Sequence, residues 1–260
     1  IAILDNFCWG DCEKAETLGA LVRAALACYD MAVALDTPFI SGKDSLNNEF
    51  SFMVDGKKRS IAIPSTLLIS AMGQVESVDQ CVTMDFKTPG NRIYQVGVTR
   101  NELGGSHFAL VNQLSGGRVP QVDPEMAKTT FHALHQAIRQ GMVRSCHDLS
   151  EGGLAVALAE MAFAGGWGAE VELTSEQHEI DAETEALFSE SNSRFLCEVP
   201  DNAAPRFEAL FKNAEPAITV AQIGTVTEGK NLVIRGESGR PLIDLSLRQL
   251  KEAWKKPLDW

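Results

Sequence analysis

The sequence predicts a mixed α/β (α+β) fold in two domains. Short runs of β-branched and aromatic residues alternate with longer segments in which apolar residues recur every three or four positions. No internal repeat interrupts this alternation, which is typical of an α/β architecture. The chain has 260 residues and 45% hydrophobic content, enough for one large domain or two modest ones.

The first predicted domain covers residues 1–75. A buried strand at Ile1–Leu4 is expected to precede a long helix from about Glu13 to Leu35, which Pro38 helps to end. The spacing predicts that one helix face is buried against a sheet; its residues are Leu18, Leu21, Val22, Ala25, Leu26, Tyr29 and Val33. Three further strands are expected at Phe39–Ile40, Phe50–Val54 and Ile61–Met72.

The second predicted domain covers residues 76–260. Asp123 and Pro124 form a typical helix start, an N-cap followed by proline, and that helix is expected to run to Gly141. The glycine-rich segment 101–117 is expected to be an ordered loop. The other helices are expected at Ser150–Ala164 and Pro205–Asn213, and the strands at Arg92–Val98, Val143–Cys146, Ala169–Leu173, Phe195–Val199, Ile218–Val226 and Asn231–Arg235.

The composition of the chain argues against nucleic acids and membranes as binding partners. The net charge of −12 disfavours non-specific nucleic-acid binding, which needs a basic surface. No uninterrupted apolar run approaches the roughly 20 residues needed to span a bilayer, so no membrane partner is expected. The six cysteines are scattered, which favours reduced thiols and a cytoplasmic location. Cys8 and Cys12 lack a second pair at zinc-like spacing, and a structural role is favoured for them.

The polar segment Ser41–Glu49 (SGKDSLNNE) is the first candidate site. Gly42 would let the backbone approach a phosphate closely, and Lys43 would supply positive charge. It is not a P-loop, because Thr37 stands where the upstream glycine is required and a strand pattern follows where a helix should start. The alternative is an ordinary polar surface turn.

The second candidate site is His147–Gly153 (HDLSEGG), between a predicted strand and a predicted helix. Ser150 would cap the helix, and the glycines would leave its first turn open to an anion. Asp148 would hold a divalent cation against the phosphates. The alternative is an N-cap with close helix packing at the glycines. Similarly, Ser189–Arg194 is either a binding loop with Arg194 for phosphate or a solvated turn.

Taken together, these motifs resemble the C-terminal part of the phosphoribosylformylglycinamidine synthase family, the synthetase of purine biosynthesis. The resemblance covers essentially the whole chain and rests on the order and spacing of Asp5-Asn6-Phe7, Ser41–Glu49 and Ser145–Leu154. It implies the aminoimidazole ribonucleotide synthetase superfamily. The expected fold is then a partial N-terminal α/β domain, which dimerises through its sheet, followed by a complete C-terminal α/β domain. A preceding synthetase segment is expected to be missing, and it would carry the family's catalytic histidine.

The resemblance also implies a reaction and a set of ligands. The family uses ATP to convert formylglycinamide ribonucleotide and glutamine-derived ammonia to the amidine, with Mg²⁺ at the phosphates and a glutaminase subunit or domain as ammonia source. By matching positions, Asp5, Gly42 and Ser150 would contact ATP or ADP, Ser45 the substrate, and Asp148 the metal. Lys43 matches a magnesium-binding asparagine of the short bacterial form, although an ammonium has no lone pair to offer a cation.

Two alternatives remain open at this point. One is another ATP-using synthetase of the same superfamily, such as aminoimidazole ribonucleotide synthetase. The other is a structural half in which a bound nucleotide stiffens the fold without turnover, because Asp148 and Ser150 match an auxiliary, non-catalytic site of the long form.

Overall fold

The computed structural model describes residues 1–174 and 183–259. The chain divides into two compact units, Ile1–Val78 and Asp79–Trp260, each built from strands and helices. The predicted mixed α/β class is therefore confirmed.

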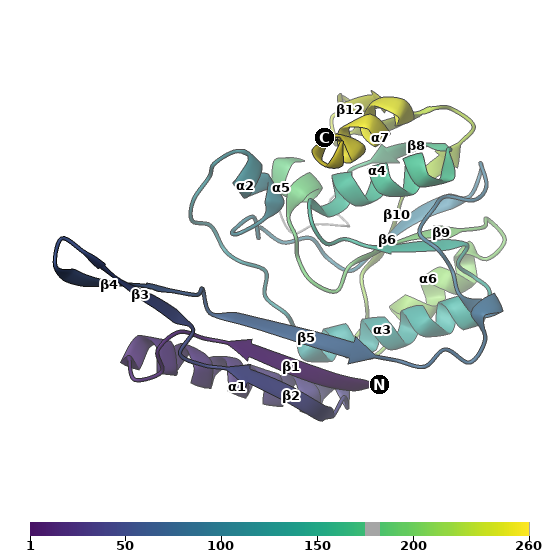
Figure 1. Ribbon diagram of the computed structural model, residues 1–260. Helices are drawn as coiled ribbons and strands as arrows, with labels where there is room; N and C mark the ends of the chain where they lie inside the picture. The colour runs from purple at the N-terminus through teal and green to yellow at the C-terminus, as the bar shows by residue number, and fades with distance from the viewer. Residues whose placement is uncertain (175–182, 260) are drawn as a thin grey trace. The chain divides into compact units, whose positions relative to one another are not determined.

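The first unit is a three-stranded sheet with one long helix. The strand order is β2-β1-β5, with β1 parallel to β2 and antiparallel to β5. A two-stranded hairpin, β3-β4, extends from this sheet (Figure 1). The element bounds are β1 Ala2–Cys8, α1 Ala15–Leu35, β2 Phe39–Ser45, β3 Glu49–Val54, β4 Lys57–Ala62 and β5 Thr66–Met72.

Two predictions about strands in this unit were wrong. The predicted strand stopped at Ile40, but residues Ser41–Ser45 form the second half of β2 and pair with β1. This parallel pairing joins segments separated by the whole of α1, and local polarity does not reveal it. The expected strand Ile61–Met72 is two strands, β4 and β5, separated by Ile63–Ser65. Pro64 in that gap lacks the N–H that a continuous ladder requires.

The predicted burial of one α1 face was also wrong. Leu26, Tyr29 and Val33 are 58%, 67% and 60% exposed, and Leu18 and Val22 are exposed as well. Of the predicted face, Leu21 alone is half-buried. It belongs to a half-buried stripe that continues through Ala24, Cys28, Met31 and Leu35. The helix is apolar on both stripes, so periodicity could not decide which one meets the sheet.

By length and composition alone, α1 could cross a membrane. Core helices of soluble proteins meet the same criterion. Glu16, Arg23 and Asp30 interrupt this helix with charge, and residues of α1 share a cavity wall with Asp5 and Phe7 of β1. The absence of a membrane partner remains a prediction.

The second unit is built on a seven-stranded sheet of order β12-β11-β8-β10-β6-β9-β7. Its ladders are antiparallel except for β8-β11. The strand bounds are β6 Arg92–Val96, β7 Ser145–Asp148, β8 Gly168–Glu172, β9 Phe195–Val199, β10 Val220–Thr227, β11 Asn231–Arg235 and β12 Pro241–Ser246. The helix bounds are α2 His107–Val111, α3 Pro124–Arg139, α4 Gly153–Gly165, α5 Glu183–Phe188, α6 Ala204–Lys212 and α7 Leu247–Lys255.

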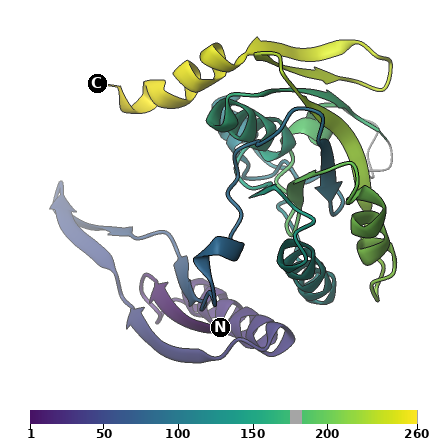
Figure 2. The same cartoon turned by 90° about the vertical axis from the view of Figure 1, so that its right-hand side faces the viewer.

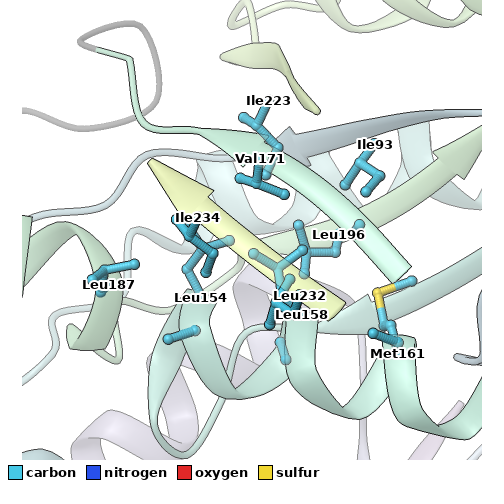
Figure 3. Close-up of a cluster of buried hydrophobic side chains, with 14 of the residues drawn as sticks. Ile93, Leu154, Leu158, Met161, Val171, Leu187, Leu196, Ile223, Leu232 and Ile234 are labelled. Atoms are coloured by element: carbon cyan, nitrogen blue, oxygen red, sulfur yellow. The ribbon is translucent and has the colours of Figure 1, made fainter. Parts of the chain in front are cut away.

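Helices cover both faces of this sheet, with α4 on one side and α3 and α6 on the other (Figure 1). Side chains alternate along each strand, so Ile93 and Leu196 join the α4 core, whereas Tyr94 and Cys197 join the α3–α6 core. Figure 3 shows Leu154, Leu158 and Met161 of α4 pointing toward the sheet. After β12 comes α7, followed by a short 3-10 helix at Lys256–Leu258 (yellow in Figure 2). Helix α7 packs on α4 through the rings of Trp254 and Phe163.

The start of α3 agrees with its prediction: the Asp123 side chain accepts the N–H of Met126 at 3.0 Å, and Pro124 is the first helical residue. Four helices or strands were not anticipated. Helix α2 lies within the segment expected to be a loop, α5 lies between two predicted strands, and β12 and α7 follow the last predicted strand.

Candidate nucleotide-binding site

Asp5 and Gly42 lie opposite each other in the parallel β1-β2 ladder. A Cβ atom at position 42 would overlap the Asp5 carboxylate, so a side chain there would require that carboxylate to move. Asp5 points toward α1, because it lines a cavity together with Cys28 and Ala32. Burial, and then the nearby charge of Asp5, raise the pKa of the Cys28 thiol. Asp5 and Gly42 therefore share the helix-facing side of the sheet.

Lys43 and Ser45 occupy the opposite face of β2, since successive side chains of a strand alternate. The Lys43 ammonium donates a hydrogen bond to the Ser45 hydroxyl. The structure thus brings together Asp5 with Gly42, and separately Lys43 with Ser45. The predicted residues of this unit form two pairs on two faces, rather than one cluster.

The end of the same motif has a structural role. Asn48 donates from its amide to Ser45 O at 2.8 Å, and Asn47 accepts the N–H of Cys12 at 3.2 Å. Glu49 accepts hydrogen bonds from Lys14 at 2.5 Å and from the N–H of Asp11 at 3.2 Å. These contacts tie the segment after β1 to the start of β3. This half of the motif holds the backbone in place through its side chains.

In the second unit, Asp148 is the last residue of β7, and its carboxylate is 57% exposed. Partial burial acts to raise the pKa of Asp148. Hydrogen bonds from the Ser150 hydroxyl and the backbone, together with nearby His147, outweigh that effect and hold the pKa below its ordinary value. The carboxylate is therefore ionised at neutral pH and available to a cation.

Ser150 does not cap α4, contrary to expectation. The N-cap is Gly152, whose φ of 79° is left-handed and favours glycine. The Ser150 hydroxyl turns back to Asp148 instead. A Cβ at Gly153 would lie 2.5 Å from the carbonyl oxygen of Ser189, so this glycine permits close packing of backbone. The packing alternative holds for Gly153.

The N-terminus of α4 already has a carboxylate beside it. Glu190 Oε1 accepts the N–H of Gly152 at 2.8 Å and the N–H of His107, which opens α2, also at 2.8 Å. Carboxylates stabilise helix N-termini by pairing with their free N–H groups. An incoming phosphate would have to share or displace this contact. Sequence reasoning placed Glu190 in the candidate loop Ser189–Arg194 but missed its contact with Gly152, which lies 38 residues away.

Arg194 is buried, so the phosphate role considered for it is wrong. Its guanidinium donates to Ser189 O, Ser191 O and Thr99 Oγ1 at 2.6, 2.8 and 2.6 Å. Burial lowers its pKa to about 10, which leaves it charged at neutral pH. Arg194 lines part of the Asp148 cavity, and its guanidinium is bound to the loop beside that cavity.

A cavity of about 370 Å³ opens beside the end of β7. Its lining includes Asp148, Ser150, Glu190, Asn192 and Phe195. In all, three carboxylates, hydroxyl and amide groups, and two phenylalanine rings line it, which suits a polar ligand with an aromatic part. Two of the predicted site residues, Asp148 and Ser150, meet at this cavity.

The described residues include no group of three or more His, Cys, Asp and Glu side chains placed to hold a metal ion. Asp148 alone could offer oxygen ligands, and Mg²⁺ commonly binds through one or two carboxylates plus phosphates and water. Lys43 cannot serve as a ligand, because its ammonium donates to Ser45. The residues present therefore fit a metal that arrives with a nucleotide.

Comparison with known proteins identifies the protein family to which the chain belongs. Residues 88–237 match the family described as AIR synthase related protein, C-terminal domain. That match covers more than half of the 260 residues, so the chain belongs to this family.

Solved structures show the same fold over nearly the whole chain. T. maritima PurL complexed with ATP has a TM-score of 0.67 at 18% identity, covering 96% of this chain and 37% of that one. PurLQS from Thermotoga maritima has a TM-score of 0.68 with the same identity and coverage. E. coli HypE, a hydrogenase maturation protein, has 0.62 at 18% identity, covering 95% of this chain and 73% of HypE. The chain thus spans 37% of the length of the PurL chains, and at these identities the likeness concerns the fold.

Proposed function

We propose that this chain is part of an ATP-dependent ligase that makes formylglycinamidine ribonucleotide from formylglycinamide ribonucleotide, ATP and ammonia. Family membership and the PurL-like fold support the superfamily, and the motif order Asp5, Ser41–Glu49, His147–Gly153 favours this activity within it. The solved PurL structures include complexes with ATP and with FGAR. Proposed partners are a preceding synthetase segment and a glutaminase subunit or domain in the cytoplasm.

The observation that carries the proposal is the ionised, exposed Asp148 at the mouth of a polar cavity, held by Ser150. In the proposed reaction, ATP phosphorylates the amide oxygen of the substrate, and ammonia then displaces phosphate. Such chemistry relies on positioned charge more than on a covalent nucleophile. Mg²⁺, when bound, would neutralise phosphate charge. Asp148 would orient that cation, and Ser150 would keep the carboxylate in one rotamer.

A second candidate, a nucleotide-binding half without turnover, is favoured by Glu190. Its carboxylate occupies the N–H groups that a phosphate would otherwise use. In this alternative the nucleotide stiffens the unit, and catalysis occurs in another part of the protein.

The first test is calorimetric titration of this chain with ADP and Mg²⁺. Binding should stabilise the folded chain by about 2.7 kcal/mol at ligand a hundred times its Kd. Asp148→Asn keeps the side-chain shape and loses the charge, so it should weaken the magnesium-dependent part of binding. If the parent chain and Asp148→Asn bind ADP with Mg²⁺ equally well, the proposal that Asp148 binds the metal is refuted.

The second test separates the two functions. A longer protein carrying this chain and the preceding synthetase segment is assayed for ADP release that depends on formylglycinamide ribonucleotide and ammonia. Loss of turnover in Asp148→Asn supports the catalytic site. Nucleotide binding that is weakened while turnover persists supports the structural alternative. The chain alone is expected to show no turnover.

A further inference from the structure

Two thiols outside the proposed site face each other across neighbouring strands. Cys146 of β7 and Cys197 of β9 are register partners in an antiparallel ladder. Their sulfur atoms lie 3.9 Å apart, with the Cys197 S–H donating to Cys146. All six cysteines of the chain are free. No function described so far uses this pair.

The backbone at this pair is already placed for a disulfide. The N–H of Cys146 donates to Thr83 O at 3.2 Å, away from β9, which marks Cys146 and Cys197 as a non-hydrogen-bonded pair. The Cα atoms of such pairs are about 4.5 Å apart, and disulfides span Cα separations of roughly 4.4–6.8 Å. The sulfur atoms can therefore close on each other by side-chain rotation, without movement of the strands.

The surroundings assign different roles to the two sulfurs. Cys197 is fully buried in the α3–α6 core, and the hydrogen bond to Cys146 together with burial raises the pKa of Cys197 well above its ordinary value. Cys146 is partly exposed, at the edge of the same core. A small oxidant can reach Cys146 first, and Cys197 then lies directly behind it.

We propose that Cys146 and Cys197 are an oxidation site that forms a reversible intramolecular disulfide with a peroxide. The Cys146 sulfur attacks the peroxide, an S–O bond forms as the O–O bond breaks, and water leaves with the thiol proton. The Cys197 sulfur then attacks the Cys146 sulfenic acid. The S–S bond forms, the S–O bond breaks, and a second water leaves with the Cys197 proton. In total, two thiols and one hydrogen peroxide give one disulfide and two waters.

The bond would act on the strand that carries Asp148. Strand β7 lies at one edge of the seven-stranded sheet, and among the described strands it pairs with β9 alone. A covalent link from Cys146 to Cys197 would hold this edge in register and oppose its fraying. The link encloses residues 146–197, and closing a loop of that length should raise the Tm by roughly 5–10 °C.

The test treats the folded chain with hydrogen peroxide, blocks free thiols, and maps peptides by mass spectrometry without reduction. We expect a linked peptide pair containing Cys146 and Cys197, its loss on adding a reducing agent, and the rise in Tm. Cys146→Ser and Cys197→Ser should each abolish both the linked peptide and the Tm shift. Cys81→Ser, which removes the exposed thiol of the same unit, should abolish neither.

Cys146→Ser keeps the buried partner intact, so the test does not depend on how Cys197→Ser folds. Oxidation of exposed Cys81 in the parent chain reports that peroxide was active. If Cys81 is oxidised while Cys146 and Cys197 remain free, the proposal is overturned. A Tm shift of the same size in Cys146→Ser would overturn it as well.

Discussion

His147 Nε2 lies 2.8 Å from Glu160 Oε2, which links the end of β7 to the middle of α4. The other oxygen of that carboxylate accepts the indole N–H of Trp254 in α7 at 3.0 Å. The second ring nitrogen of His147 lies 3.2 Å from Asp148 Oδ1. One carboxylate thus connects the C-terminal helix to the strand that carries the candidate metal ligand.

We expect Glu160→Ala to lower the free energy of unfolding by about 1 kcal/mol, because it removes the acceptor of the part-buried His147 ring and of the Trp254 indole, which is 55% exposed. Urea denaturation measures the loss, and Trp254 fluorescence should shift to the red as α7 loosens. Glu252→Ala is the matched control in the exposed part of α7, where the nearest ion pair, to Arg248, is 3.9 Å long. A variant equal in stability to this control would contradict the connecting role.

Glu198 should be a major stabilising residue of the second unit. Its buried carboxylate accepts from the N–H of Lys87 and of Thr88, from Asn91 Nδ2 and from Ser145 Oγ, at 2.7, 2.9, 2.6 and 3.0 Å. Glu198→Ala leaves these donors without an acceptor and should cost about 3 kcal/mol or more. Chemical denaturation of the parent and the variant measures this loss in the free energy of unfolding.

Asp201→Asn is the control for that experiment. Asp201 pairs with Arg92 at the surface, and its side chain is 75% exposed. Exposed pairs contribute about 0–1 kcal/mol, so this variant should remain close to the parent. Similar losses in Glu198→Ala and Asp201→Asn would refute the assignment.

Exposure of the α1 stripe predicts that Leu26→Asp is tolerated. Leu26 is 58% exposed, and surface substitutions usually change stability by about 0.5 kcal/mol or less. Leu158→Asp, at a fully buried position in α4, places an unpaired charge in the core and should prevent folding. Expression in soluble form and thermal melting compare the two. If both variants are insoluble, Leu26 is buried in the folded protein, as the sequence pattern predicted.

Glu49 should make the stability of the first unit depend on acid. Hydrogen bonds from Lys14, from Ser60 and from the N–H of Asp11 lower the pKa of Glu49 from 4.5 to about 2. A depressed carboxyl pKa contributes stability that is present above about 4.5 and is lost as the pH falls toward 2. Glu49→Gln should therefore melt lower than the parent at pH 6, with the difference shrinking toward pH 2. Glu13→Gln, at an exposed position, should show no such convergence.

Local patterns were sufficient where the determinants are close in sequence. The α3 start needs only Asp123, Pro124 and the N–H of Met126. The fold class follows from alternating strands and helices. Asp148 ends a strand and Ser150 follows it by two residues, so their contact is local as well. These features depend on short-range geometry, which a sequence displays directly.

Long-range contacts explain what could not be predicted. The Ser41–Ser45 strand exists because β1 lies beside it, and the two faces of α1 are similarly apolar. Glu190 reaches Gly152 across 38 residues, and Arg194 turns inward because carbonyl oxygens converge on it. Nothing in the polar composition of Ser189–Arg194 distinguishes an inward arginine from an outward one.

Because a side chain at position 42 would overlap the Asp5 carboxylate, substitutions at these two positions are expected to depend on each other. Gly42→Ala alone meets the carboxylate, whereas Asp5→Gly removes the three atoms nearest to the added methyl group. The two substitutions should therefore be strongly non-additive in a double-mutant cycle, as expected for residues in direct contact. Homologous chains with a larger residue at position 42 are then expected to have a smaller one at position 5. The two positions should therefore covary.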